Sequence, residues 1–274
     1  MLPQLTLDAE AAVRLLVGFL REEISRTGLT RAVIGLSGGI DSALAAYLTA
    51  AALGPEHVLC VMMPYASSSR ESVEHAELVV RALGVRSELV DITPMVDPMI
   101  ATDAEMNRLR RGNIMARQRM IVLYDRSARE HALVVGTGNK TELMLGYSTL
   151  FGDSACALNP LGDLYKTQVW QLSRFLDIPE VIISKAPSAD LWAGQTDEEE
   201  LGISYEDADT LLYFMIDERA SDEELLRQGF PSERIERVRH LVRVNQFKRL
   251  PPIIAKVGHR TVNADFRYPR DWGS

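Results

Sequence analysis

The chain has 274 residues, of which 46% are hydrophobic and 25% charged, and this composition excludes fibrous and intrinsically disordered proteins. The net charge of −8 argues against a general nucleic-acid binder, because counterion release from a phosphate backbone requires a basic surface. No stretch approaches the roughly 20 uninterrupted apolar residues of a membrane span, and the two cysteines, Cys60 and Cys156, suit a reducing compartment. We therefore expect a cytoplasmic protein with inert thiols and no membrane partner.

The predicted elements begin with a helix over residues 8–27, where apolar residues recur at helical spacing. A short segment at 31–36 is rich in residues that favour strands and leads directly into Ser-Gly-Gly. Residues 43–53, which follow, have a strong helix propensity. The alternation continues with strands expected at 57–62, 85–91 and 132–135, and with helices expected at 71–83 and 103–130. Beyond residue 150 the chain is rich in loops, with helices expected at 164–176 and between 204 and 247.

This alternation of strands and helices predicts an α/β fold, a doubly wound parallel sheet flanked by helices. The whole chain, 1–274, is expected to form a single domain, with the C-terminal helices packed on the same core. Ligands of such sheets bind beyond the carboxyl ends of the strands, which is where the Ser-Gly-Gly lies.

The segment between the first strand and its helix is the most informative one. Two adjacent glycines let the backbone approach a ligand, their N–H groups can converge on an anion, and the following helix directs its positive end at bound phosphate. A Walker sequence is absent. A turn and helix cap without a ligand is the alternative. The expected ATP-binding residues of this loop are Gly35, Leu36, Ser37, Gly38, Gly39, Ile40, Asp41 and Ser42.

Asp41 sharpens this interpretation, because a carboxylate beside bound phosphate is repelled unless a cation lies between them. Asp41 is therefore the first candidate ligand for Mg²⁺. Ser-Gly-Gly-x-Asp-Ser after the first strand resembles the loop of the ATP pyrophosphatases, enzymes that split ATP into AMP and pyrophosphate. That superfamily implies a Rossmann-like fold of the adenine nucleotide alpha hydrolase type.

Five further blocks resemble the NAD synthetase family in order and spacing, namely Asn113–Met120, Gly136–Glu142, Gly146–Asp153, Pro160–Thr167 and Pro187–Tyr205. The resemblance implies amidation of deamido-NAD by ammonia, through an acyl-adenylate formed with ATP as co-substrate. It implies Mg²⁺ as cofactor and a homodimer as the assembly. Catalysis would be electrostatic, without a covalent nucleophile.

When the functional residues of the family are matched to these motifs, the resemblance implies that Thr137 lies near ATP. It also implies that Glu142 is the second magnesium ligand, beside Asp41. It puts Lys166 against the phosphates, and Ser188 stands where the family has a threonine that contacts ATP.

On the side of deamido-NAD, Arg117 matches the arginine of the family that contacts this substrate, while Arg119 suits a structural or phosphate role. Phe247 and Lys248 fall where the family has substrate contacts, although Phe247 could belong to the core.

Two positions depart from the family pattern. Many single-domain members have lysine at the position of Leu150 and aspartate at that of Ala157, and Asp153 could take over part of this polar role. The sequence around them resembles the branch often fused to a glutaminase domain. Because the first strand is expected at residue 31, the chain leaves no room for such a domain before it, which favours free ammonia over glutamine. A separate glutaminase subunit is an open alternative.

Two polar stretches, Met63–Ser72 and Ala193–Gly202, are expected to close over the site as lids. Two other functions stay open at this point. One is another ATP pyrophosphatase that amidates a different acid, as GMP synthetases do. The other is a nucleotide-binding module without catalysis, which would need neither Asp41 nor Glu142.

Overall fold

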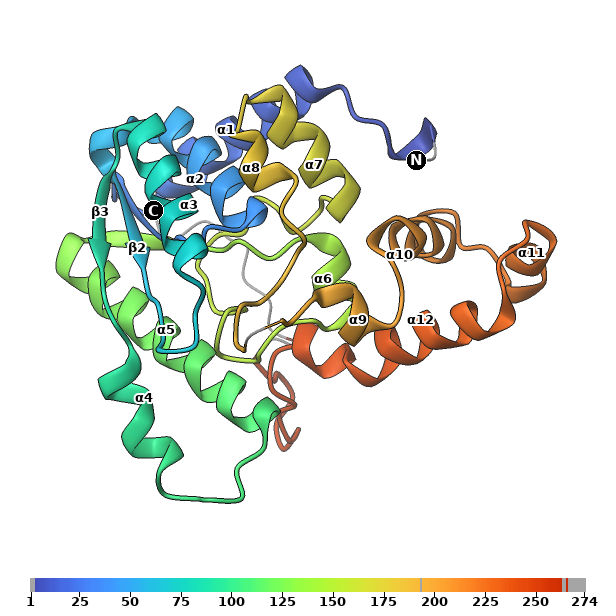
Figure 1. Ribbon diagram of the computed structural model, residues 1–274. Helices are drawn as coiled ribbons and strands as arrows, with labels where there is room; N and C mark the ends of the chain where they lie inside the picture. Colours follow the sequence, from blue (N-terminus) through green and yellow to red (C-terminus); the bar gives the residue numbers. More distant parts are fainter. Residues whose placement is uncertain (1–2, 193, 263–264, 266–274) are drawn as a thin grey trace.

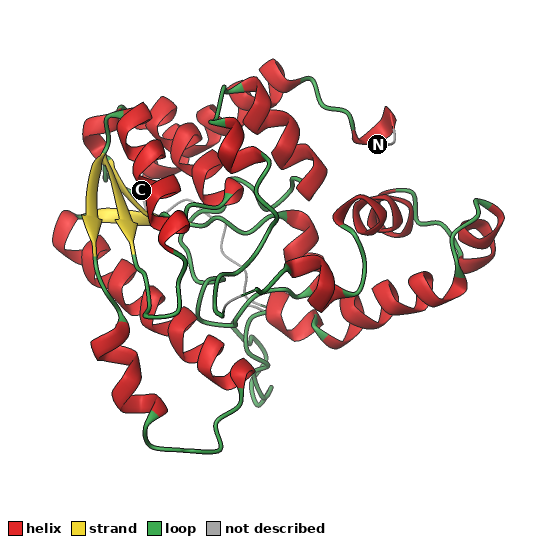
Figure 2. Ribbon diagram, viewed as in Figure 1, coloured by secondary structure: helices red, strands yellow, loops and turns green. Residues whose placement is uncertain are grey.

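A parallel four-stranded sheet lies between two layers of helices (Figure 1, Figure 2). A computed structural model describes residues 3–192, 194–262 and 265. The strands lie in the order β3-β2-β1-β4 and comprise β1 (Arg31–Gly35), β2 (Val58–Met62), β3 (Arg86–Leu89) and β4 (Ala132–Val135). This confirms the predicted parallel α/β sheet.

The strand order places the Gly-rich loop at a reversal of the winding direction. From β1 the chain first adds β2 and β3 on one side, then returns to add β4 on the other side of β1. The central strand β1 pairs in register with both neighbours, Ala32 opposite Val58 and Leu133. Because ligands of doubly wound sheets bind at such a switch point, the loops after β1 and β4 are expected to share one site.

Helices cover both faces of the sheet, as Figure 1 shows. One face carries α1 (Ala9–Arg26), α2 (Ile40–Leu53), α3 (Arg70–Leu83), α7 (Lys166–Phe175) and α8 (Glu180–Ile183). The opposite face carries α4 (Thr93–Ile100) and α5 (Arg108–Glu130). All five residues of β2 are buried between these layers. Burial raises the pKa of the Cys60 thiol in β2 to about 12.

The C-terminal helices enclose a hydrophobic cluster of their own. They comprise α9 (Asp197–Leu201), α10 (Tyr205–Leu212), α11 (Asp222–Arg227) and α12 (Ser232–Val244), with a π-helical turn at Tyr213–Asp217 and a 3-10 turn at Gln246–Arg249. Their apolar residues form a cluster with α6 (Lys140–Leu145) and with Leu5. Trp170 of α7 contacts both clusters. That the chain is a single domain stays a prediction.

The start of the long helix differs from the sequence-based expectation. The long helix begins at Arg108 instead of 103, because the Asn107 side chain caps it by accepting a hydrogen bond from the Arg110 amide. The separate helix α4 lies before it in a stretch with two prolines. Short 3-10 turns lie at Pro3–Leu5 and Pro55–His57.

In the part of the chain that the structure describes, no helix is long and apolar enough to cross a membrane.

Candidate active site

The glycine loop after β1 is tightly constrained. Gly38 has φ +81°, and a Cβ on it would lie 2.0 Å from the backbone oxygen of Ser72, so only glycine fits. The loop is also braced by its own serines, since the Ser42 hydroxyl donates to the Gly39 oxygen (2.9 Å) and accepts from the Ser37 amide (3.2 Å). Gly39 is the N-cap of α2, so the loop opens onto the positive end of a 14-residue helix.

Three charged side chains meet beside this loop. The Lys166 Nζ lies 2.5 Å from Oδ2 of Asp41 and 3.6 Å from Oε1 of Glu142. Asp41 stands in the first turn of α2, Glu142 in α6 and Lys166 at the start of α7. Because β1 and β4 are neighbours in the sheet, the helices that follow them begin side by side. The three residues predicted to be catalytic are thus brought together.

Asn139 completes this group, and the sequence analysis missed it. Its side-chain amide donates to Oδ1 of Asp41 (2.8 Å), and its side-chain oxygen accepts from the Glu142 amide (2.9 Å). Its backbone amide donates to Oε2 of Glu142 (3.1 Å), which closes a capping box at the start of α6. The spacing Asn-x-x-Glu was a readable capping signal. We call Asp41, Asn139, Glu142 and Lys166 the buried ion cluster.

Two acids and one ammonium leave the buried ion cluster with one carboxylate in excess. Burial and the neighbouring Asp41 raise the pKa of Glu142 to about 8. Burial alone would lower the pKa of Lys166, but the carboxylates of Asp41 and Glu142 outweigh it and hold that pKa above its usual value. Only 2% of the Lys166 side chain is exposed, so its ammonium is a fixed charge.

Residues of the C-terminal helices α9 and α10 contact the elements that carry the buried ion cluster. The buried carboxylate of Asp209 in α10 accepts from the Thr141 hydroxyl and from the Thr167 amide, and so joins the starts of α6 and α7. The Tyr205 ring lies 5.0 Å from the Lys166 Nζ, and its hydroxyl donates to buried Asp197 (3.0 Å). Asp197 and Tyr205 belong to the block Pro187–Tyr205, but the contacts of Tyr205 with Lys166 and of Asp209 with α6 and α7 have no local signal, because these partners are distant in the chain.

The candidate magnesium ligands form a pair rather than a cage. Among the described residues, no group of three or more His, Cys, Asp or Glu side chains could hold a metal ion. Two carboxylates beside an anion-binding loop suit Mg²⁺, which commonly takes one or two protein carboxylates and completes its octahedron with phosphate and water. The donor set of Asp41 and Glu142 therefore fits this ion.

The residues predicted to contact deamido-NAD surround the segment from Gly146 to Asp153. Nε of exposed Arg117 donates to the Leu150 oxygen (3.3 Å), and the Thr149 amide donates to Oδ1 of Asp153 (2.7 Å). Lys248 donates to the backbone oxygens of Gly146 (2.6 Å) and Ser148 (2.8 Å). We call Arg117, Leu150, Asp153 and Lys248 the outer cluster.

The remaining predicted residues are more scattered. Thr137 lies in the loop after β4, and the Ser188 hydroxyl accepts from the Asp190 amide (3.1 Å). Ala157 packs against the core of the sheet, with its amide donating to Val134 (2.9 Å). Phe247 is 58% exposed, so it is not a core residue. Arg119 donates to the Met63 oxygen (3.0 Å), a structural contact.

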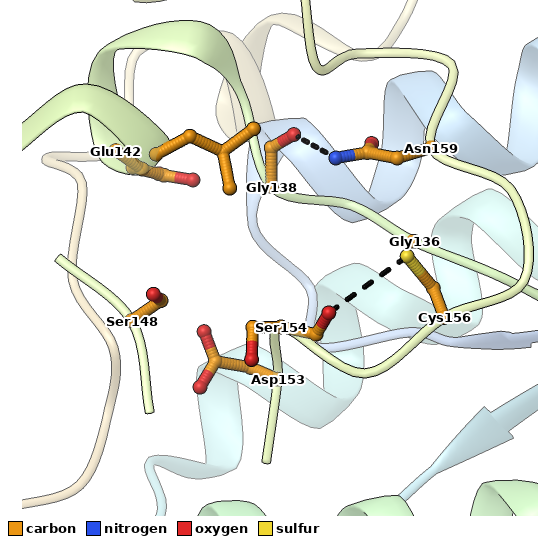
Figure 3. A pocket seen from close by; sticks show the side chains of 9 residues that line it. Gly136, Gly138, Glu142, Ser148, Asp153, Ser154, Cys156 and Asn159 are labelled. Carbon is orange, nitrogen blue, oxygen red and sulfur yellow. Dashed lines mark hydrogen bonds between the residues drawn. The ribbon is translucent and has the colours of Figure 1, made fainter. Parts of the chain in front are cut away.

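A small cavity joins the two clusters. Figure 3 shows Glu142 of the buried ion cluster on one side and Asp153 of the outer cluster on another. The cavity has a volume of about 20 Å³ and is also lined by Gly136, Gly138, Leu143, Ser148, Ser154, Cys156 and Asn159. Its wall is held in shape by a hydrogen bond from the Asn159 amide group to the Gly138 oxygen (2.9 Å). This space suffices for one molecule the size of water.

The first predicted lid, Met63–Ser72, is linked to the segment that precedes the second. The Ser67 hydroxyl donates to the Leu191 oxygen (3.1 Å), and the Ser69 amide donates to the Asp190 carboxylate (3.2 Å). The second predicted lid begins at Ala193, which lies outside the described residues, and continues into α9. Closure of both lids over a ligand stays a prediction.

Comparisons with known proteins agree with this geometry. The family model described as NAD synthase matches residues 12–252. An NH(3)-dependent NAD(+) synthetase of Trichlorobacter lovleyi is 56% identical over 270 residues, which cover 98% of this chain and 99% of the relative.

Two solved structures agree as well. The NH3-dependent NAD synthetase of Campylobacter jejuni, in complex with nitrate, is 33% identical with a TM-score of 0.79, covering 92% of this chain and 100% of the other. An NMN synthetase of Francisella tularensis is 31% identical with a TM-score of 0.81, covering 91% and 99%. With an ATP-pyrophosphatase loop at the switch point of its sheet and a family match over most of its length, this chain belongs to the NAD synthase family.

Proposed function

We propose that this chain is a ligase that converts deamido-NAD to NAD with ammonia and ATP, releasing AMP and pyrophosphate. Membership of the NAD synthase family supports the reaction class. The observation that carries the proposal is the convergence of Asp41, Glu142 and Lys166 beside the Gly38–Gly39 loop. A nucleotide-binding module without catalysis would not need to bury two carboxylates and an ammonium together.

In the first step, an oxygen of the pyridine carboxylate attacks the α-phosphorus of ATP, and the bond to the bridging oxygen of pyrophosphate breaks. In the second step, ammonia attacks the carbonyl carbon of the acyl-adenylate, and AMP leaves as the amide of NAD forms. Neither step needs a protein nucleophile. The amides of residues 37–42 and the fixed charge of Lys166 stabilise the negative charge that develops on pyrophosphate.

Asp41 and Glu142 are the residues that would hold Mg²⁺. When bound, this ion supplies a positive charge that polarises the phosphate oxygens of ATP. Asn139 orients both carboxylates by donating one hydrogen bond to each, and its side-chain oxygen accepts a third from the Glu142 amide. Without the ion, the ammonium of Lys166 pairs with Asp41 and lies near Glu142.

We assign the small cavity between the two clusters to ammonia. Its volume of about 20 Å³ fits one molecule of this size, and Glu142, Asp153 and two serines offer acceptors for N–H groups. Because the cavity lies between the carboxylates of the buried ion cluster and the outer cluster, ammonia there would stand near the bond between adenylate and acyl group.

We further propose that the enzyme works as a homodimer in the cytoplasm. Analytical sedimentation can test the dimer, and fractionation of cells can test the compartment.

The decisive experiment supplies Mg-ATP and ammonium with deamido-NAD and follows AMP and NAD together. We expect one AMP for each NAD, and no more than slow turnover with glutamine as the nitrogen source. Xanthosine monophosphate tests the GMP synthetase-like alternative. Nicotinic acid mononucleotide is the second acid to compare, because one structural neighbour is named an NMN synthetase. Faster turnover of either acid than of deamido-NAD would overturn the substrate assignment.

A further inference from the structure

Lys185 is linked to the glycine loop through Ser72, on the β2 side of that loop. Its Nζ donates to the Ser72 hydroxyl at 3.0 Å. Ser72 is buried, and its backbone oxygen is the atom that packs against Gly38. Since α3 follows β2, and the cavity-forming segments follow β4, β1 and its loop separate Lys185 from the cavity.

The charge of Lys185 is not neutralised by another side chain. In the part of the chain that the structure describes, Lys185 forms no ion pair, whereas Lys166 pairs with both acids of the buried ion cluster. The nearest acid along the segment, Asp190, is hydrogen-bonded to the Ser69 amide. A partly buried lysine that lies beside an anion-binding loop and makes no ion pair is suited to an anionic ligand.

We propose that Lys185 is a further ATP-binding residue, which contacts the two phosphates that leave as pyrophosphate. The inference rests on the proposed function. The α-phosphorus must face the acyl group and the cavity on the β4 side, so the β- and γ-phosphates extend toward the β2 side, where Lys185 stands. Lys166 and Lys185 then approach the triphosphate from its two sides, one through α7 and one through the segment after α8.

The experiment compares binding of three ligands to the full-length chain by calorimetry with Mg²⁺ present: ATP, inorganic pyrophosphate and AMP. Lys185→Met should weaken ATP and pyrophosphate binding about tenfold, a typical loss for one charged contact, and leave AMP binding unchanged. Lys185→Arg should restore most of the lost affinity, because the positive charge is kept. Lys256→Met is the matched control, since Lys256 is exposed and paired with Asp265.

Ser72→Ala separates this role from a structural one. If Lys185 only fixes α3 to the segment after α8, removing the hydroxyl should weaken ATP binding as much as Lys185→Met does. We expect Ser72→Ala to keep the affinity of the wild type for ATP and pyrophosphate. The inference is wrong if Lys185→Met keeps its ATP affinity, loses AMP binding equally, or is matched by Ser72→Ala.

Failure of the inference and failure of the proposed function can be told apart in the same series. If the wild type binds ATP and amidates deamido-NAD while Lys185→Met binds ATP as tightly, only the role of Lys185 falls. If the wild type binds neither ATP nor pyrophosphate, the proposed function falls and the inference falls with it.

Discussion

The buried ion cluster and the outer cluster, which we propose to bind different partners of the same reaction, are built in different ways. In the buried ion cluster, each charged group is met by another protein group, and the side chain of Lys166 is almost fully enclosed. In the outer cluster, Arg117 and Lys248 bind backbone oxygens, and Asp153 accepts from a backbone amide. The charged groups of the first cluster are thus fixed by other side chains, whereas those of the second contact the backbone.

Under the proposed function, this difference would separate the residues that serve the chemistry from those that select the acid. Adenylation by ATP is common to many pyrophosphatases, so its residues can lie on rigid helix starts at the sheet. Of the residues proposed to contact deamido-NAD, Arg117 lies in α5, whereas Leu150 and Asp153 lie in the loop segment after α6. Of the two departures from the family pattern, Leu150 lies in this loop segment and Ala157 packs against the core of the sheet.

The largest expected effect comes from breaking the buried ion cluster itself. Asp41→Asn or Glu142→Gln removes a carboxylate that the developing charge requires, and we expect kcat to fall at least about a hundredfold. Release of pyrophosphate with deamido-NAD measures the loss, and circular dichroism should report an intact fold. Near-normal turnover in both variants would remove the role assigned to these acids.

A smaller loss is expected when the acids stay but lose their orientation. Asn139→Ala removes the hydrogen bonds of its side chain to Asp41 and to the Glu142 amide, and kcat should fall about tenfold. Asn107→Ala is the matched control, because this asparagine also caps a helix but lies far from the loop. Both variants should lose about 1 kcal/mol of stability. Equal activity in the two would show that Asn139 only caps α6.

The outer cluster should respond in binding rather than in chemistry. Arg117→Met is expected to raise KM for deamido-NAD about tenfold, because one charged contact is lost, while KM for ATP stays unchanged. Steady-state kinetics with each substrate varied in turn provides the test. A comparable rise in KM for ATP would mean that the two clusters are not separable.

The smallest effect concerns the pH dependence of stability without nucleotide or metal. Because the pKa of Glu142 is raised to about 8, the unfolded chain releases this proton more readily than the folded one. The stability contributed by the neutral form is therefore complete below about pH 4.5 and is lost as the pH rises toward 8. Glu142→Gln should not show this decline. The test is thermal unfolding of the wild type and of Glu142→Gln with a chelator present, from pH 5 to pH 9. If the two melting temperatures changed in parallel with pH, the raised pKa of Glu142 would be contradicted.

Much of the fold could be predicted from local sequence. The four strands and the helices over 8–27, 71–83 and 164–176 were expected close to their observed positions, because periodicity and glycine turns are local signals. The short helix α6 was missed although Asn139 and Glu142 mark its capping box. The packing of the C-terminal helices with α6 and Leu5 has no local signal, since which apolar face meets which depends on distant partners.

The sequence by itself determined the phosphate loop and the identity of Asp41, Glu142 and Lys166, because each stands in a recognisable motif. Only the tertiary structure decided that these three meet, that Asn139 bridges the two acids, and that Lys185 lies beside Gly38. The physical reason is the order of the strands. A parallel sheet that reverses its winding at β1 places the ends of β1 and β4 side by side, although the chain between them is long.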